Sequence, residues 1–368
     1  MLSTIAVIDL GHQTWFWATT VVIVVVLVAL NLALLVGVHV RNIREASRAR
    51  RAVHFRELYG HILDVWAEYP PTESELESTR QDLPTFTSIQ RDVAAESLIA
   101  QLRDASPEER ARTLERLRQV GAIDFLFESL RRRVPWRRTL AIRLLGHAGA
   151  DEAVPLLVER IGDRNRYVRN AAVRALGRIG DTRAIEPLSQ VFLEPGRIVP
   201  GTAYEALLAF GQRSAPVFRE GLRSPNQRVR VASAFGVGSV LDPAEATPLL
   251  TPRLADESPL VRAGAAQMLG RIGGDQVTDE LARAARDDER SVRRAAVSAL
   301  AGYDDPQAAE LAARALDDPD RDTVMHAGET LVRLSRLSRA GPAAKDAVAE
   351  REAWPIERAQ ILASLGAL

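Results

Sequence analysis

The sequence contains no cysteine and only one lysine, Lys345, and it carries no net charge. The absence of cysteine excludes disulfides, thiolate nucleophiles and thiolate metal ligands together. The 48 basic and 48 acidic residues balance, so the overall charge indicates neither a nucleic-acid partner nor an acidic substrate. Any electrostatic signal in this protein must therefore be local.

Motifs that carry chemistry are also missing. The chain has no GxxxxGK[ST] loop for phosphate, no nucleophile triad and no carboxylates at metal-ligand spacing. We therefore expect a protein that is not an enzyme, with no catalytic residue, no metal site and no cofactor.

One long apolar run is present, over residues 15–40, and it is centred on residues 21–30. About 20 such residues span the hydrocarbon core of a bilayer. No arginine or lysine precedes the run, so the charged start of a cleavable signal peptide is missing. The pattern predicts a single, uncleaved transmembrane helix.

The charges that flank this run predict its orientation. Basic residues follow it, namely Arg41, Arg44, Arg48, Arg50 and Arg51, whereas residues 1–14 contain none. The positive-inside rule then places residues 1–14 outside and the rest of the chain in the cytoplasm, at the inner (plasma) membrane. Aromatic residues at the outer interface would be Trp15, Phe16 and Trp17.

The predicted span also has a stripe of small residues, Ala29, Ala33 and Gly37, with Asn31 on roughly the opposite face. Such a stripe permits close approach of a second helix, and a purely anchoring role stays open beside it. After the span we expect a basic juxtamembrane helix over residues 41–69, a linker over 70–88 that begins with two prolines, and a folded array over 89–368.

The array is recognised by a repeated motif. The clearest copies read VRNAAVRALGRIG from Val168, VRAGAAQMLGRIGG from Val261 and VRRAAVSALAGY from Val292, and weaker ones begin at Arg137, Val229, Val324 and Glu357. Most successive copies are about 31 to 34 residues apart, which indicates one pair of helices per repeat.

Each copy has apolar residues at helical spacing, and a second helix follows it. The residues expected to face the core are Val168, Ala172, Val173 and Leu176 in the motif helix and Ile185, Leu188 and Val191 in the second helix, over residues 184–192. Either Gly177 or Gly180 would end the motif helix. Since neither helix buries its apolar stripe alone, the pairs must stack, which predicts an all-α fold, an α-α superhelix preceded by the transmembrane helix.

The pattern D-x5-VRxxAxxALGxxG resembles the bacterial type of HEAT repeat that is also found in phycobilisome lyases, from about Ile89 to the C-terminus. The resemblance implies a HEAT-like solenoid with a structural ladder, here Asp163 with Arg169, Asp256 with Arg262, and Asp287 with Arg293. The ladder would be broken at Ser224 and Met325, and the helix near residues 195–200 interrupted by proline and glycine.

Two enzyme classes share this architecture. A di-iron hydroxylase is implied by paired His-Glu dipeptides, and the six histidines include none. A chromophore-lyase-like enzyme is the weaker alternative, because the match rests on scaffold residues alone.

The interpretation we favour is a membrane-tethered scaffold or adaptor whose concave face is lined by the second helices, and one form of it is an accessory subunit of a membrane enzyme. Its partner would be a cytoplasmic or membrane protein, and we expect neither a small-molecule substrate nor nucleic acid. An alternative stays open: nucleic acid or anionic lipid could bind a basic cluster with one aromatic residue, formed by Arg131, Arg132, Arg133, Trp136, Arg137 and Arg138.

Overall fold

The computed structural model describes residues 88–196, 198, 200–273 and 277–349, together with positions 73, 74, 77 and 81. The chain divides into two compact units, Met1–Asp104 and Ala105–Leu368. The first unit contributes α3 (Ser88–Arg103), and the second contains the repeats. The predicted start of the array at Ile89 thus lies in α3, whereas the unit that holds the repeats begins at Ala105.

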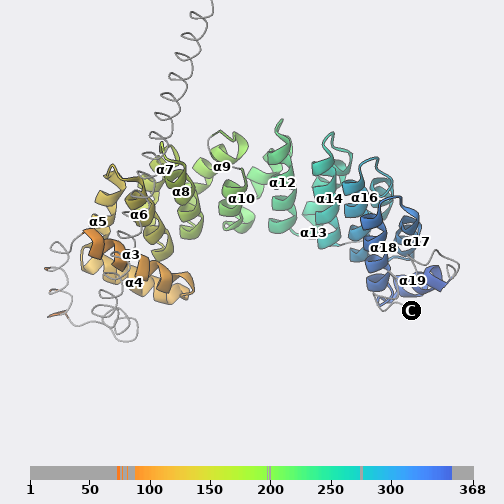
Figure 1. Ribbon diagram of the computed structural model, residues 1–368, viewed down its shortest axis with the longest axis horizontal. Helices are drawn as coiled ribbons and strands as arrows, with labels where there is room; N and C mark the ends of the chain where they lie inside the picture. Colours follow the sequence, from red (N-terminus) through yellow and green to blue (C-terminus); the bar gives the residue numbers. More distant parts are fainter. Residues whose placement is uncertain are drawn as a thin grey trace, which may run out of the picture. The chain divides into compact units, whose positions relative to one another are not determined.

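Every regular element within the described ranges is a helix, which confirms the predicted all-α fold. In the second unit the motif copies form the helices α6 (Pro135–Ala148), α8 (Arg166–Ile179), α12 (Gln227–Val240), α14 (Pro259–Ile272), α16 (Arg290–Ala299) and α18 (Arg321–Leu334). A further helix, α10 (Pro200–Leu208), takes the equivalent place between α8 and α12 and is counted with the motif helices below. Each of these motif helices packs on the next one, so that they stand side by side in chain order (Figure 1).

A second set of helices alternates with the motif helices. They are α5 (Ala122–Arg131), α7 (Val154–Ile161), α9 (Ile185–Leu193), α11 (Ala215–Gly221), α13 (Pro243–Leu250), α15 (Thr278–Ala284), α17 (Pro306–Arg314) and α19 (Ala340–Ala349), and α4 (Pro107–Gln119) precedes them. Short 3₁₀ helices lie in several connections. η2 (Asp151–Ala153), η3 (Thr182–Ala184), η4 (Gly211–Ser214) and η6 (Leu300–Gly302) follow motif helices, and η5 (Thr251–Ala255) and η7 (Ala315–Asp317) lie between repeats.

The core follows the predicted pattern in α8, where Val168, Ala172, Val173 and Leu176 are all fully buried. In α9 the inward face is shifted slightly. Leu188 is buried as predicted, but Phe192 rather than the half-buried Val191 is the large side chain that fills the core. Phe192 also meets Phe218 of α11 edge to face, with ring centroids 5.6 Å apart, which joins two successive repeats.

Two glycines of the motif have different roles. Gly180 ends α8 with φ 70°, a left-handed conformation that glycine adopts without strain. Gly177 lies inside α8, where an added Cβ would be 2.7 Å from the Cα of Ala206 in α10. Gly146 of α6 approaches Ala175 of α8 in the same way. Neighbouring motif helices therefore meet backbone to backbone at this position.

Helix starts and stops also follow local chemistry. Ser106 and Glu109 form a reciprocal capping box at the start of α4, and the side chain of Asn165 accepts a hydrogen bond from the N–H of Tyr167 at the start of α8. The interruption predicted near residues 195–200 is the stretch between the end of α9 and the start of α10, which leaves α10 with nine residues where α8 has fourteen.

Several predictions lie outside the described residues: the span over 15–40 with its interfacial and small residues, the juxtamembrane arginines, nearly all of the 70–88 linker, and the last motif copy from Glu357. Among the helices whose residues are described, none combines the length and the hydrophobicity that crossing a bilayer requires.

Candidate functional site

An aspartate–arginine ladder joins successive repeats. Arg262 donates from Nε and Nη2 to the carboxylate of Asp287, each at 2.7 Å, and Arg293 binds Asp318 in the same bidentate way at 2.7 and 3.1 Å. The predicted partner of Arg262, Asp256, instead offers its backbone carbonyl to Nη1 at 3.0 Å. Each arginine therefore contacts the backbone of its own repeat and the carboxylate of the following one.

The same backbone contact forms within the other two predicted pairs. Arg169 Nη1 donates to the carbonyl of Asp163, and Arg293 Nη1 donates to the carbonyl of Asp287, each at 3.0 Å. Within each predicted pair the contact is therefore made to the backbone carbonyl of the aspartate, whereas the carboxylates of Asp163, Asp256 and Asp287 bind arginines of the preceding repeat. Spacing in the sequence showed which residues recur and could not show which repeat each side chain reaches.

The ladder is largely shielded from solvent. The side chains of Arg230 and Asp256 are 7% and 5% exposed, and their hydrogen bond raises the pKa of Arg230. Burial raises the pKa of Asp287, but hydrogen bonds from Arg262 and from the N–H of Glu289 outweigh it, so this pKa is lowered overall. Both shifts favour the ionised forms of Arg230 and Asp287, and buried charges of this kind depend on their partners.

The basic cluster predicted near α6 divides into two parts. Arg138 donates from Nη2 to Asp163 at 3.1 Å and from Nη1 to the carbonyl of Arg132 at 2.7 Å, which is the ladder geometry. Its side chain is only 13% exposed. The structure thus assigns Arg138 to the ladder. The sequence did not show this role, because Arg132 occupies the position that Asp163, Asp256 and Asp287 occupy in other repeats.

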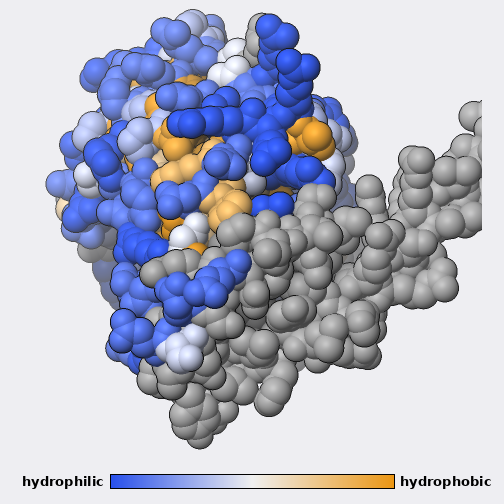
Figure 2. Space-filling model, turned by 90° about the vertical axis from the view of Figure 1, so that its left-hand side faces the viewer, coloured by the Kyte–Doolittle hydropathy of each residue, from blue (hydrophilic) through white to orange (hydrophobic). Residues whose placement is uncertain are grey.

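The remaining members of the cluster lie nearer the surface. Arg131, Arg132 and Arg133 are exposed, Trp136 is 45% exposed, and the guanidinium of Arg137 lies 5.2 Å from the Trp136 ring centroid. Exposed hydrophobic groups of this kind are scattered: the face in Figure 2 is mostly hydrophilic, with small hydrophobic patches among its described residues.

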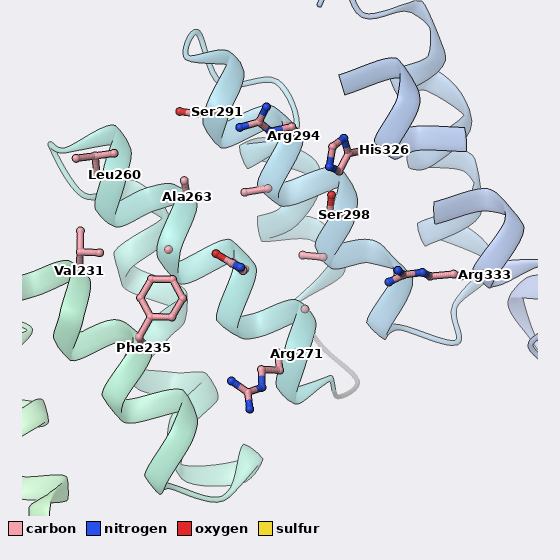
Figure 3. A pocket seen from close by; sticks show the side chains of 15 residues that line it. Val231, Phe235, Leu260, Ala263, Arg271, Ser291, Arg294, Ser298, His326 and Arg333 are labelled. Carbon is pink, nitrogen blue, oxygen red and sulfur yellow. The ribbon is translucent and has the colours of Figure 1, made fainter. Parts of the chain in front are cut away.

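A groove with the form of a binding site crosses the motif helices α12, α14, α16 and α18 (Figure 3). Its volume is about 610 Å³. We expected a groove on the second helices, but all the lining residues come from the motif helices: Val231, Phe235, Leu260, Ala263, Gly264, Gln267, Gly270, Arg271, Ser291, Arg294, Ala295, Ser298, Ala299, His326 and Arg333.

Small side chains make up much of the groove between its charged residues. They are Ala263, Gly264, Gly270, Ala295, Ser298 and Ala299. Gly270 of α14 lies against Ala299 of α16. The close approach of the two helices requires small residues there, so no bulky side chain projects from the floor of the groove at this point. Because little side-chain volume stands between the walls, a bound chain can approach the helices closely.

One end of the groove is apolar. Val231 and Phe235 of α12 lie there with Leu260 of α14, whose side chain is 57% exposed. An exposed leucine beside a half-buried aromatic ring gains from being covered by another apolar group.

The rest of the groove is basic. Arg294 and His326 lie toward one side and Arg271 and Arg333 toward the other (Figure 3). None of the described lining residues is acidic. His326 Nδ1 is 2.7 Å from the carbonyl oxygen of Asp322, which can only accept, so Nδ1 carries the proton and donates.

The sequence offered a weak signal for this groove. Arg271, Arg294 and Arg333 are ordinary arginines among many, and only the stacking of three successive motif helices brings them onto one surface. No cluster of three or more potential metal ligands occurs within the described ranges.

The comparisons with known proteins agree with this architecture. Residues 123–208 and 215–301 match the family model of HEAT repeats, so the chain contains HEAT repeats in the segment that holds most of the ladder. No curated protein matched the sequence.

Solved structures show the same fold at low identity. The karyopherin Kap121p bound to the SUMO protease Ulp1p is 13% identical, with a TM-score of 0.57, over 82% of this chain and 37% of that one. The structure of Kap95p with RanGDP is 13% identical, with a TM-score of 0.54, over 80% and 46%. This chain thus spans less than half the length of these karyopherins. The complex of CpcE and CpcF of phycocyanin lyase from Nostoc is 20% identical over 66% of this chain and 94% of that one, but its TM-score is 0.35.

Proposed function

We propose that this chain is a membrane-tethered scaffold, not an enzyme, and that it binds a segment of another protein in the groove of α12, α14, α16 and α18. The observation that carries the proposal is the groove itself, which extends over four repeats with polar, basic and apolar side chains facing solvent. Long shallow surfaces of this kind suit a protein segment better than a small substrate, which needs an enclosed pocket.

Similar folds supply supporting cases. One structure shows Kap121p bound to the extreme C-terminus of the protein phosphatase Cdc14p, at 12% identity and a TM-score of 0.56. That structure is an example of a protein segment bound by this fold. For this chain, a protein partner is proposed from its own groove.

The tether rests on the sequence. The apolar run over residues 15–40 and the arginines after it support an anchor in the inner membrane, with the repeats in the cytoplasm. Tethering raises the effective concentration of a membrane-associated partner, so a weak contact in the groove is enough. The stripe of Ala29, Ala33 and Gly37 offers a second contact to a partner that itself spans the membrane.

The test uses a photo-crosslinking amino acid at Ser298 in the groove and, as a matched control, at Arg314 on α17, which does not line it. Both are introduced into the full-length protein and into a form that starts at Ile43. One protein crosslinked through Ser298 and not through Arg314, in both forms, is the expected result. Capture that disappears in the shorter form would assign recognition to the anchor instead.

A second candidate is supported by the surface part of the basic cluster, where Arg131, Arg132 and Arg133 are exposed near Trp136. Anionic lipid headgroups beside the anchor would suit these charges. Co-sedimentation of the form that starts at Ile43 with vesicles containing phosphatidylglycerol, compared with neutral vesicles, tests this role. Glutamine at the three arginines should abolish any difference.

A further inference from the structure

We infer that the groove takes an extended, acidic segment of the partner protein, with apolar side chains at the end formed by Val231, Phe235 and Leu260. This inference rests on the proposed function and adds the chemistry of the partner. Its basis is the distribution of charge, shape and apolar surface within one groove.

Charge complementarity is the first argument. The chain as a whole has equal numbers of acidic and basic residues, yet the described lining of the groove has three arginines, one histidine and no carboxylate. Arg271 and Arg333 form no ion pair with any residue that the structure describes. Arg294 has one partner, Asp322, at 3.5 Å, and both side chains are well exposed, at 43% and 70%.

An exposed pair of this kind contributes little to stability, so Arg294 can exchange Asp322 for a carboxylate of a ligand at small cost. The guanidinium groups can bind such carboxylates through two parallel hydrogen bonds. Because Arg294 and Arg271 approach from different sides of the groove, a ligand with carboxylates along both edges would meet them together (Figure 3).

Shape is the second argument. Packed helices lie about 8 to 10 Å apart, so the four motif helices extend over about 27 Å. An extended chain rises about 3.3 Å per residue, so about eight residues cross the groove. The small residues between the walls let a backbone lie close to the helices, and Gln267 and Ser298 offer side-chain hydrogen bonds to its peptide groups.

The apolar end favours a peptide over a nucleic acid. Single-stranded nucleic acids are gripped by rows of stacking aromatic rings beside a positive track. The described lining has one benzene ring, that of Phe235, which adjoins the aliphatic side chains of Val231 and Leu260, and the imidazole of His326 lies apart from it on α18. A leucine or similar aliphatic side chain can pack against that apolar end. A nucleobase would instead require aromatic rings on which to stack.

The probe for the test is a fluorescein-labelled nonapeptide with a leucine at each end and five glutamates between, so that either direction of binding is allowed. Its counterparts carry glutamine or lysine at the five positions, and a nine-nucleotide single-stranded DNA serves as the competing class. Binding to the full-length protein in mild detergent is followed by fluorescence anisotropy.

The variant is Arg271→Gln with Arg333→Gln, two exposed side chains whose loss leaves the core intact. The matched control is Arg283→Gln with Arg314→Gln, which changes the net charge equally on α15 and α17, outside the groove. We expect the acidic peptide to bind about tenfold tighter than its glutamine counterpart, and the groove variant to lose about tenfold in affinity, while the control stays within about twofold.

Equal binding of the three peptides, or an equal loss in both double variants, overturns the inference. Tighter, groove-dependent binding of the DNA overturns it in favour of nucleic acid. The proposed function is judged separately: a partner segment without acidic residues crosslinked at Ser298 keeps the scaffold and ends the acidic preference. Arginine-dependent binding of the acidic peptide without any crosslinked protein supports the preference and contradicts the scaffold.

Discussion

Pro200 and Ser224 stand at the two ends of a missing rung in the ladder. Arg138, Arg230, Arg262 and Arg293 each bind a carboxylate 25 or 26 residues further on. Pro200 takes the arginine position in α10, and Ser224 takes the aspartate position before α12. The hydroxyl of Ser224 still accepts the N–H of Asn226 at 3.2 Å, as ladder aspartates do two residues ahead. Both charges are absent together, so neither position leaves a charge facing an uncharged one.

This interval should open more readily than those with a rung, because α10 is short and no ion pair among the described residues joins it to α12. We expect the amide hydrogens of α10 to exchange with solvent about tenfold faster than those of α14, which is held by rungs on both sides. Hydrogen exchange followed by mass spectrometry measures this difference. Equal protection of the two helices would show that the rungs do not control local opening.

Arg138 and Arg133 belong to one basic run, but their replacement should change the free energy of unfolding by different amounts. Arg138→Met leaves the carboxylate of Asp163, 6% exposed, without its charged partner, and we expect the free energy of unfolding to fall by about 3 kcal/mol or more. Arg133→Met removes an exposed side chain and should change it by less than about 0.5 kcal/mol. Urea unfolding followed by circular dichroism compares them. Similar losses in both variants would remove Arg138 from the ladder.

The contact of Gly177 with Ala206 predicts an unusual result for a glycine in a helix. Alanine normally stabilises a helix relative to glycine by about 1 kcal/mol. At Gly177 the added methyl would push α10 away from α8, so Gly177→Ala should destabilise by about 1 to 2 kcal/mol net.

Gly162→Ala is the matched control, because φ there is −84° and the nearest atom to an added Cβ is an oxygen 3.6 Å away. Thermal unfolding should show a lower Tm for the first variant and no decrease for the second. A Tm for Gly177→Ala at or above that of the parent would contradict backbone contact between α8 and α10.

The pair of Arg118 and Glu152 predicts how stability depends on acid. Hydrogen bonds from Arg118, at 2.9 and 2.8 Å, lower the pKa of Glu152 from 4.5 to about 2. Between these values the unfolded chain binds a proton that the folded chain does not, so the stabilisation is present above pH 4.5 and is lost as pH falls toward 2.

Glu152→Gln should therefore make the loss of stability over this pH range shallower, in urea titrations at a series of pH values. Glu310→Gln is the control, since that carboxylate is exposed beside Arg314 on one helix turn. An unchanged pH dependence for Glu152→Gln would mean that the pair is not held in solution.

Much of the fold could be predicted from the sequence, because burial of apolar side chains imposes a period that can be counted. The positions of Val168 and Leu176 in the core follow from that period alone. The apolar period could not decide whether Gly177 or Gly180 ends α8. The role of Gly177 depends on the distance from α8 to α10, and α10 lies outside the motif.

The groove could not be predicted for a related reason. Arg271, Arg294 and Arg333 are separated by more than twenty residues each, and their common surface results from helix stacking. Arg138 shows the reverse case, in which residues adjacent in the sequence have different roles. The run of arginines around Arg138 suggested one shared function, but Arg138 binds Asp163 of the next repeat.

The ladder also determines how the array would respond to a mechanical load. Each rung ties only neighbouring repeats, so tension applied at the two ends passes through every interface in series. The interval between α10 and α12 has no such rung and should yield more readily than the intervals that have one. The groove begins at α12 and lies entirely beyond that link, so strain there would turn the repeats that line the groove without deforming its surface.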